Sequence, residues 1–186
     1  MGSFGAQPTK ITDVESYNGG DLDLCAINFY VGTEIDNKLP RSFLADYFKS
    51  QQKVIWIGYN IWQLGEQLEQ EMGLRVLRVT HAGIDLADDT FRDILYRGQV
   101  FPKTSTRSVQ VELVPTDLRK FEALAEIRHS RSREVIPYIV RSENRFYIAD
   151  NPFEMPGNRD AGFVFTNVLG EILGLQHFPQ AQYEFR

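Results

Sequence analysis

KVIWIGYNIWQL, residues 53–64, is the stretch that says most about how this chain folds. It contains four consecutive apolar residues, 54–57, so neither alternating face of a strand built from them carries a polar side chain. Such a strand is typical of a parallel sheet that is covered on both sides. The apolar run breaks at Gly58-Tyr59-Asn60 and resumes with helical spacing. The stretch therefore predicts a buried strand, a tight turn and a helix.

The tight turn lies where functional residues of α/β proteins gather, at the carboxyl edge of the parallel strands. Many α/β hydrolases carry a nucleophile there, on a Gly-x-nucleophile turn. In this chain Asn60 occupies that position, and an amide cannot act as a nucleophile. No Gly-x-Ser-x-Gly sequence is present, and the single cysteine, Cys25, falls inside a predicted strand. The turn therefore predicts binding rather than nucleophilic catalysis.

The elements around this stretch alternate between strand and helix. A strand is predicted at 24–31, a helix starting near Pro40, a helix through Leu68 that stops at Gly73, and a strand at 74–80. Because β-α-β connections are almost always right-handed crossovers, this alternation predicts that the three strands pair in parallel.

The second half of the chain is less regular. Alternating patterns predict strands at 91–101 and 108–114, joined by a hairpin loop at 102–106, and a helix is predicted at 115–129. A further hairpin is predicted with arms at 135–141 and 145–149, followed by a helix at 161–173 that ends at Gly174. Pro137 lacks a backbone N–H, which predicts that the first arm of this hairpin lies at a sheet edge.

Length and composition predict one ordinary domain. The 186 residues are expected to divide into a tail or cloning remnant at 1–16, a single α/β domain at 17–178, and the start of a following region or a C-terminal tail at 179–186. The net charge of −5 and the pI near 5.3 argue against a nucleic-acid partner. No apolar stretch approaches the ~20 residues of a membrane-spanning helix, so no span is predicted.

Metal and cofactor sites are not predicted. The three histidines, His81, His129 and His177, are far apart in the sequence, and none belongs to a short-spaced ligand pair. The glycine pair Gly19-Gly20 is not followed by the lysine and hydroxyl residue of a phosphate loop, so it is interpreted as a turn.

A set of polar and aromatic residues is expected at the carboxyl edge. Aromatic faces beside carboxylates and amides suit sugar rings, which stack through C–H groups and form hydrogen bonds through hydroxyls. A purely structural interpretation stays open for each residue: Asn60 can take a left-handed turn, Trp62 can belong to the core, and Asp150-Asn151 can form a plain turn. The candidate ligand-binding residues are Thr33, Glu34, Tyr59, Asn60, Trp62, His81, Asp150 and Asn151.

Four phrases of the chain carry a resemblance to a known family. They are YVGTEIDNKLPRSFLADYF (30–48), KVIWIGYNIWQL (53–64), PYIVRSENRFYIADNPF (137–153) and FVFTNVLGEILGLQHF (163–178). In this order they resemble the amino-terminal region of a family of largely uncharacterised bacterial polysaccharide deacetylase-like proteins, where a similar region precedes the deacetylase barrel. The resemblance covers 17–177 and is weak between 81 and 108.

This resemblance implies a flavodoxin-like or class I glutaminase-like three-layer α/β sandwich, with a mostly parallel sheet and an antiparallel hairpin. In glutaminase-like domains the turn after the corresponding strand carries a cysteine nucleophile, and Asn60 stands there in this chain. The metal-binding aspartate and HxxxH histidines of the deacetylase belong to the barrel and have no counterpart here. The resemblance also implies a cell-envelope or extracytoplasmic location, and a strand and a helix upstream of the region that matches Ser16-Tyr17, where only a short tail is expected in this chain.

Three hypotheses on function follow. The leading one is a non-catalytic accessory domain of polysaccharide deacetylation, which binds glycan or packs against a deacetylase domain in cis or in trans. The second is a hydrolase that uses a convergent pair such as His81 and Asp150. The third is a structural module that forms homo-oligomers, in which a partner chain supplies the missing strand.

Overall fold

The computed structural model describes residues 10–79, 91–103, 110–151 and 159–174 and shows an α/β protein with a mixed sheet of seven strands. The sheet is parallel in its β1-β2-β9 part and antiparallel from β9 to β5. In spatial order its strands are β1 Ile27–Gly32, β2 Lys53–Gly58, β9 Arg145–Ile148, β8 Val135–Ser142, β7 Glu122–His129, β4 Phe91–Tyr96 and β5 Gln99–Pro102.

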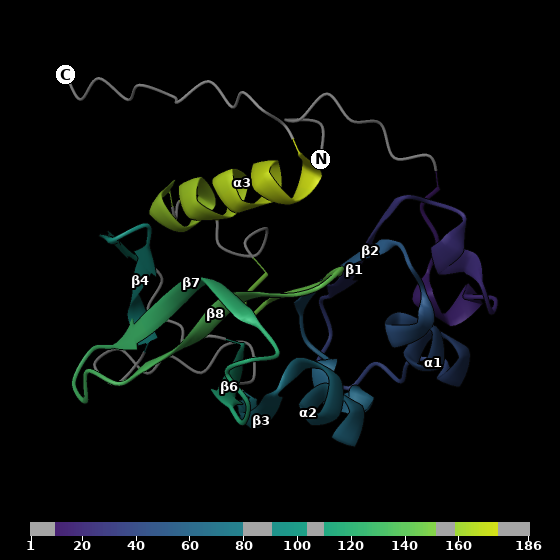
Figure 1. The fold of residues 1–186 in the computed structure, drawn as a ribbon, viewed down its shortest axis with the longest axis horizontal. Coiled ribbons are helices and arrows are strands. Elements are labelled where there is room, and N and C mark those ends of the chain that lie inside the picture. The colour runs from purple at the N-terminus through teal and green to yellow at the C-terminus, as the bar shows by residue number, and fades with distance from the viewer. Residues whose placement is uncertain (1–9, 80–90, 104–109, 152–158, 175–186) are drawn as a thin grey trace.

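The remaining elements cover the two faces of this sheet (Figure 1). Helix α3, Arg159–Leu173, lies on one face. Helix α1, Arg41–Lys49, and helix α2, Glu66–Met72, lie on the other face. They share that face with a small antiparallel sheet of β3, Leu74–Val79, and β6, Val111–Pro115. Three short 3-10 turns complete the described elements: η2 Val14–Ser16, η3 Asp21–Asp23 and η4 Ile61–Leu64.

The strand, turn and helix predicted at residues 53–64 are confirmed. Every residue of β2 after Lys53 is buried, as expected for a strand with a layer on each side. Strand β1 pairs with β2 in parallel, and Pro40 directly precedes α1. The helical segment after the turn consists of η4 and α2, and it ends at Gly73, whose left-handed φ of 64° suits glycine.

The prediction that the third strand pairs in parallel with the first two is wrong. Strand β3 forms where it was expected, but it pairs antiparallel with β6 in the small sheet. Its place next to β2 is taken by β9, which comes from the second half of the chain. The β8–β9 hairpin therefore completes the parallel part of the sheet, a long-range pairing that local alternation of elements cannot show.

The helix predicted at 115–129 is also wrong, because most of this segment forms β7. Asp117 accepts a hydrogen bond from the backbone N–H of Arg119, and the N–H groups of Thr116 and Asp117 donate to the carbonyl of Gly73, so a turn forms here. Beyond it, Ala125 and Ile127 are buried and β7 pairs with both β4 and β8. The good helix formers in this segment are overridden by pairing on two sides.

Two hairpin predictions need different corrections. The loop predicted at 102–106 does not join two paired strands, because β4 pairs with β5 across Arg97-Gly98 and β6 pairs with β3. The β8–β9 hairpin is confirmed, but β8 lies inside the sheet rather than at its edge. Pro137 is tolerated there because it pairs with Glu126 next to a register irregularity in β7.

Arg145 fastens the amino ends of the parallel strands to the end of α1. Its guanidinium donates to the carbonyls of Ser50 and Gln52, the latter at 2.7 Å, and it lies 5.5 Å from the centre of the Tyr47 ring. Burial lowers the pKa of Arg145. The buried cation is thus held by carbonyl dipoles and an aromatic face.

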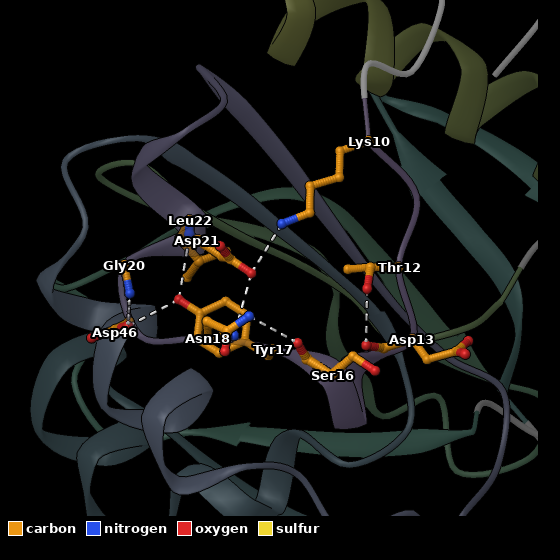
Figure 2. Close-up of polar contacts among 10 residues, drawn as sticks. All are labelled: Lys10, Thr12, Asp13, Ser16, Tyr17, Asn18, Gly20, Asp21, Leu22 and Asp46. Atoms are coloured by element: carbon orange, nitrogen blue, oxygen red, sulfur yellow. Dashed lines mark hydrogen bonds and ion pairs between the residues drawn. The ribbon is translucent and has the colours of Figure 1, made fainter.

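Residues 10–24 form a strap that is tied to α1 through Tyr17 (Figure 2). The Tyr17 hydroxyl donates to Asp46 of α1 at 2.9 Å and accepts from the backbone N–H of Leu22 at 3.3 Å. Asp46 also accepts from the N–H of Gly20 at 2.8 Å, and the Tyr17 ring packs edge-on against Phe43 at 5.3 Å. One carboxylate therefore anchors the strap at two points.

We expect the protein to lose stability at alkaline pH when Tyr17 ionises. Burial, together with the hydrogen bond to Asp46 and its charge, raises the pKa of Tyr17 to about 12. The folded-state pKa lies above the unfolded value near 10, so this contribution is complete below pH ~10 and is lost as the pH rises towards 12. At pH 8 we expect Tyr17→Phe to lower the free energy of unfolding by about 1 kcal/mol.

Urea unfolding of the parent and of Tyr17→Phe at several pH values between 8 and 11 measures this effect. The stability gap between the two proteins should shrink above pH ~10, where the unfolded tyrosine ionises. A gap of constant size across this range would show that the Tyr17 hydroxyl does not link the strap to pH.

Candidate functional site at the carboxyl edge

The ends of β1, β2 and β9 lie at one edge of the sheet. Gly32 is in register with Gly58, and Ile57 is in register with Ile148. The residues that follow these strands, 33–34, 59–60 and 150–151, are therefore brought to the same edge. This gathering was expected from the sequence. Of the two other candidates, Trp62 follows in η4, and His81 lies outside the described residues.

The turn after β2 packs tightly against the end of β1. The backbone N–H of Tyr59 donates to the carbonyl of Gly32 at 3.2 Å, and the indole N–H of Trp56 donates to the carbonyl of Tyr59 at 2.8 Å. A Cβ atom on Gly32 would lie only 2.4 Å from the Tyr59 carbonyl oxygen. Backbone thus fills the space between the ends of β1 and β2, and only glycine fits at position 32.

Asn60 is a structural residue of this turn. It is fully buried, and its backbone adopts a left-handed φ of 75°. Its side-chain N–H groups donate to the Tyr30 hydroxyl at 3.0 Å and to the Glu34 carbonyl at 2.9 Å. Its buried side-chain oxygen has no hydrogen-bond partner. The Asn60 amide therefore holds the loop that follows β1.

A second amide holds the same loop further along. Gln63, in η4, donates to the carbonyl of Asn37 at 2.7 Å and accepts from the N–H of Leu39 at 3.0 Å. Together with Asn60 it fastens residues 33–39, which we call the clamped loop, to the turn and to η4. Thr33 and Glu34 are exposed on this loop. Their positions are thus set by the buried Asn60 amide and the partly buried Gln63 amide, although their own side chains face solvent.

The two aromatic candidates differ in what they offer to a ligand. Tyr59 is only 1% exposed and belongs to the core, whereas Trp62 is half-buried. Their rings meet edge-on, with centroids 6.4 Å apart. Trp62 therefore has a supported ring with an open part, and it is the aromatic candidate that can contact a ligand.

Asp150 lies in a buried polar network rather than on the surface. Its carboxylate forms an ion pair with the Lys103 ammonium at 2.7 Å, and both side chains are 0% exposed. It also accepts from the backbone N–H of Gln110 at 2.8 Å and from the Tyr138 hydroxyl at 3.1 Å. Burial, followed by the charge of Asp150 and the hydrogen bond to it, raises the pKa of Tyr138 strongly.

Gln110 links this network to the turn after β2. Its side-chain oxygen accepts from the backbone N–H of Asn151 at 3.0 Å. A Cβ atom on Gly58 would lie 2.7 Å from that same oxygen. Asn151 is buried, so the residues after β9 form part of the interior beneath the exposed side chains of this edge. Lys103 and Gln110 were missed by sequence reasoning, because they flank a polar stretch with no motif and meet Asp150 only in the fold.

The described residues show neither a metal site nor a membrane-spanning helix. Among the described residues, no group of histidine, cysteine and acidic side chains is arranged to hold a metal ion. In the same part of the chain, no helix has the length and apolar character needed to cross a membrane.

Neither known family models nor curated proteins match this chain. Of the candidate residues that the structure describes, Thr33, Glu34 and Trp62 have side chains that are exposed or only partly buried.

Proposed function

We propose that this chain is a non-catalytic accessory domain of polysaccharide deacetylation, which binds glycan or packs against a deacetylase domain through its carboxyl edge. The observation that carries the proposal is the role of Asn60. Its side chain is fully buried, and its N–H groups donate to the Glu34 carbonyl and to the Tyr30 hydroxyl. Such a residue shapes a surface and does not react with a substrate.

The clamped loop and Trp62 support a binding surface beside this turn. Binding costs less when the contacting residues are already ordered, because little conformational entropy remains to be lost. The amides of Asn60 and Gln63 order the loop in this way. The half-buried Trp62 ring offers an apolar face, and the carboxylate of Glu34 and the hydroxyl of Thr33 can form hydrogen bonds with sugar hydroxyls.

The finer fold assignment is part of this proposal. We propose that the β1-β2-β9 part of the sheet, with α1 and α2 on one face and α3 on the other, belongs to a flavodoxin-like or class I glutaminase-like arrangement. Parallel strands between helical layers support it. Under this assignment, Asn60 replaces the nucleophile of a glutaminase-like site, in agreement with a non-catalytic role.

A hydrolase based on Asp150 receives less support. A general base must be within hydrogen-bond reach of the proton that it removes. The Asp150 carboxylate has no exposed surface and is engaged by Lys103, Gln110 and Tyr138. In this arrangement it is a structural charge, and its replacement should affect stability before any activity.

Titration with oligosaccharides tests the binding proposal. The probes are an N-acetylglucosamine oligomer and a galacturonate oligomer, with isothermal calorimetry as the readout. We expect one of them to bind, and we expect Trp62→Ala to weaken that binding at least tenfold, in line with the ~1–3 kcal/mol that aromatic contacts contribute at binding sites. Leu118→Ala is the matched control, because Leu118 is 73% exposed on the turn next to Gly73, away from the carboxyl edge.

Two outcomes of this titration would contradict glycan binding at the carboxyl edge. If a wider set of acidic and N-acetylated glycans shows no binding, the glycan-binding version is wrong. If binding occurs but Trp62→Ala and Leu118→Ala behave alike, the ligand is held elsewhere on the protein. The readout in both cases is affinity, so neither outcome depends on a catalytic activity.

A further inference from the structure

The strap makes a tight turn at residues 18–21, next to the two groups that anchor it to Asp46 (Figure 2). The backbone N–H of Asp21 donates to the carbonyl of Asn18 at 3.0 Å and closes this turn. Gly20, at its third position, has a left-handed φ of 88°, which glycine adopts without strain. Asn18 is the one asparagine of the whole sequence that glycine follows. The turn therefore places an Asn-Gly pair within the attachment of the strap.

The side chain of Asn18 and the nitrogen of Gly19 are both accessible. Both residues are exposed, and the hydrogen bond from the Asn18 amide to the Ser16 carbonyl is 3.3 Å long. Within the described part of the chain, the Gly19 N–H donates no hydrogen bond. Because glycine has no side chain, nothing on residue 19 itself hinders an approach to its nitrogen. An exposed amide thus stands directly before an unhindered backbone nitrogen.

Asn144 provides a contrast within the same protein. It is also exposed and lies in a turn, the one between β8 and β9. Its amide donates to the Gln51 carbonyl at 2.9 Å, so it is held by a shorter hydrogen bond than the Asn18 amide. The next residue, Arg145, is buried and carries a long side chain beside its backbone nitrogen. Of these two exposed turn asparagines, Asn18 is therefore the more reactive.

We propose that Asn18 is a site of spontaneous deamidation. The Gly19 nitrogen forms a bond to Cγ of Asn18 and loses its proton, and the side-chain nitrogen takes up a proton and leaves as ammonia. The product is a five-membered succinimide ring, which one water molecule opens at either carbonyl. One opening gives aspartate at position 18. The other gives isoaspartate, in which the backbone passes through the former side chain and is longer by one carbon atom.

Both products weaken the attachment of the strap to α1. The backbone N–H of Asn18 donates to the Asp21 carboxylate at 3.3 Å, so a new carboxylate at position 18 lies near a like charge and is repelled. Isoaspartate also lengthens the backbone between Tyr17 and Gly20. These two residues donate to the same oxygen of Asp46, at 2.9 and 2.8 Å, and the lengthened chain loses the contact from Gly20. The isoaspartyl strap is then anchored through Tyr17 alone.

This inference goes beyond the proposed function, because it concerns the strap and leaves the clamped loop and Trp62 unchanged. The two proposals fail separately. Deamidation is measured by mass at residue 18 whether or not glycan binds, and the calorimetric titration with glycan uses protein whose Asn18 is intact.

Peptide mapping by mass spectrometry measures the reaction in the full chain during incubation at mildly alkaline pH. We expect the amide of Asn18 to be replaced by a carboxyl group, with aspartate and isoaspartate as separable isomers, while Asn144 keeps its amide. Gly19→Ala should lose most of the reaction, because its methyl group hinders attack by the nitrogen. This variant fits the fold, since a Cβ at position 19 would meet only an Asp46 oxygen, at 3.9 Å, which is an ordinary contact. Asn18→Gln, whose longer side chain closes a ring less readily, should also keep its amide.

Amide hydrogen exchange measures the release of the strap. Anion-exchange chromatography separates the isoaspartyl form from the parent, because the new carboxylate adds one negative charge. We expect residues 20–24 to exchange about fivefold faster in the isoaspartyl form, the factor that corresponds to the loss of one net hydrogen bond. Helix α3 is the internal control and should exchange alike in both forms.

Two results overturn the proposal. Asn18 that keeps its amide, or that reacts no faster than Asn144, shows that this turn is not a deamidation site. An isoaspartyl form whose residues 20–24 exchange like those of the parent shows that the modification does not release the strap.

Discussion

Asp150→Asn should lower the free energy of unfolding by about 3–5 kcal/mol, because it leaves the ammonium group of Lys103 buried without a counter-charge. Both side chains of the parent pair are 0% exposed, and Nζ and the carboxylate oxygen are 2.7 Å apart. Removing one charge from such a pair exposes the full desolvation cost of the other. For a chain of this size the melting temperature should fall by roughly 6–20 °C.

The double variant Lys103→Met with Asp150→Asn is the informative control. It removes both charges while position 150 keeps an oxygen that can accept from the Gln110 N–H. We expect the double variant to be more stable than Asp150→Asn alone, so the two changes will not add. Urea unfolding with a constant m-value measures each free energy.

An exposed ion pair provides the reference for a small loss of stability. The side chains of Glu122 and Arg141 are 56% and 49% exposed, and Glu122→Gln should change stability by no more than about 1 kcal/mol. If Asp150→Asn falls in that same range, or if its effect simply adds to that of Lys103→Met, the buried pair does not stabilise the carboxyl edge as described.

Gly32→Ala should destabilise the protein by about 3 kcal/mol through a clash with fixed backbone. The added Cβ would lie 2.4 Å from the carbonyl oxygen and 2.8 Å from the nitrogen of Tyr59. These atoms cannot move as a flexible side chain would, because Tyr59 sits in the turn that Trp56 and Asn60 hold in place. The turn must therefore shift, and we expect faster amide exchange in the clamped loop together with the lower stability.

Gly162→Ala is the matched control for this substitution. A Cβ at Gly162, inside α3, would meet no atom within 4 Å. Alanine is the better helix former, so this change should raise stability by about 0.5–1 kcal/mol. If Gly32→Ala shows the same sign as Gly162→Ala, the close approach of β1 and the turn is not a constraint in solution.

Elements whose local sequence pattern and structure have the same cause were predicted correctly. The run 54–57 is apolar on both faces because layers cover both faces of β2. Gly73 ends α2 because its backbone is left-handed, a conformation that glycine adopts without strain. The hairpin around residues 142–145 and the last helix were also found, since turn chemistry and helical spacing are local features.

Elements whose structure depends on partners distant in the sequence were predicted wrongly. The residues Glu122 to His129 include good helix formers, yet they form β7 because β4 and β8 offer pairing on both sides. Pro137 is tolerated inside the sheet because an irregularity in β7 lies opposite. The sequence of each segment contains no information about which strand will be its neighbour.

The candidate site divides in the same way. By itself the sequence determined that a buried strand ends in the Gly58-Tyr59-Asn60 turn and that no nucleophile follows, because residue type and apolar pattern are properties of the chain. Only the tertiary structure decided that Asn60 and Asp150 are buried supports, with Lys103 as the partner of Asp150. Burial and charge pairing depend on which elements pack together. Lys103 and Asp150 are 47 residues apart in the sequence, so their pairing follows only from the fold.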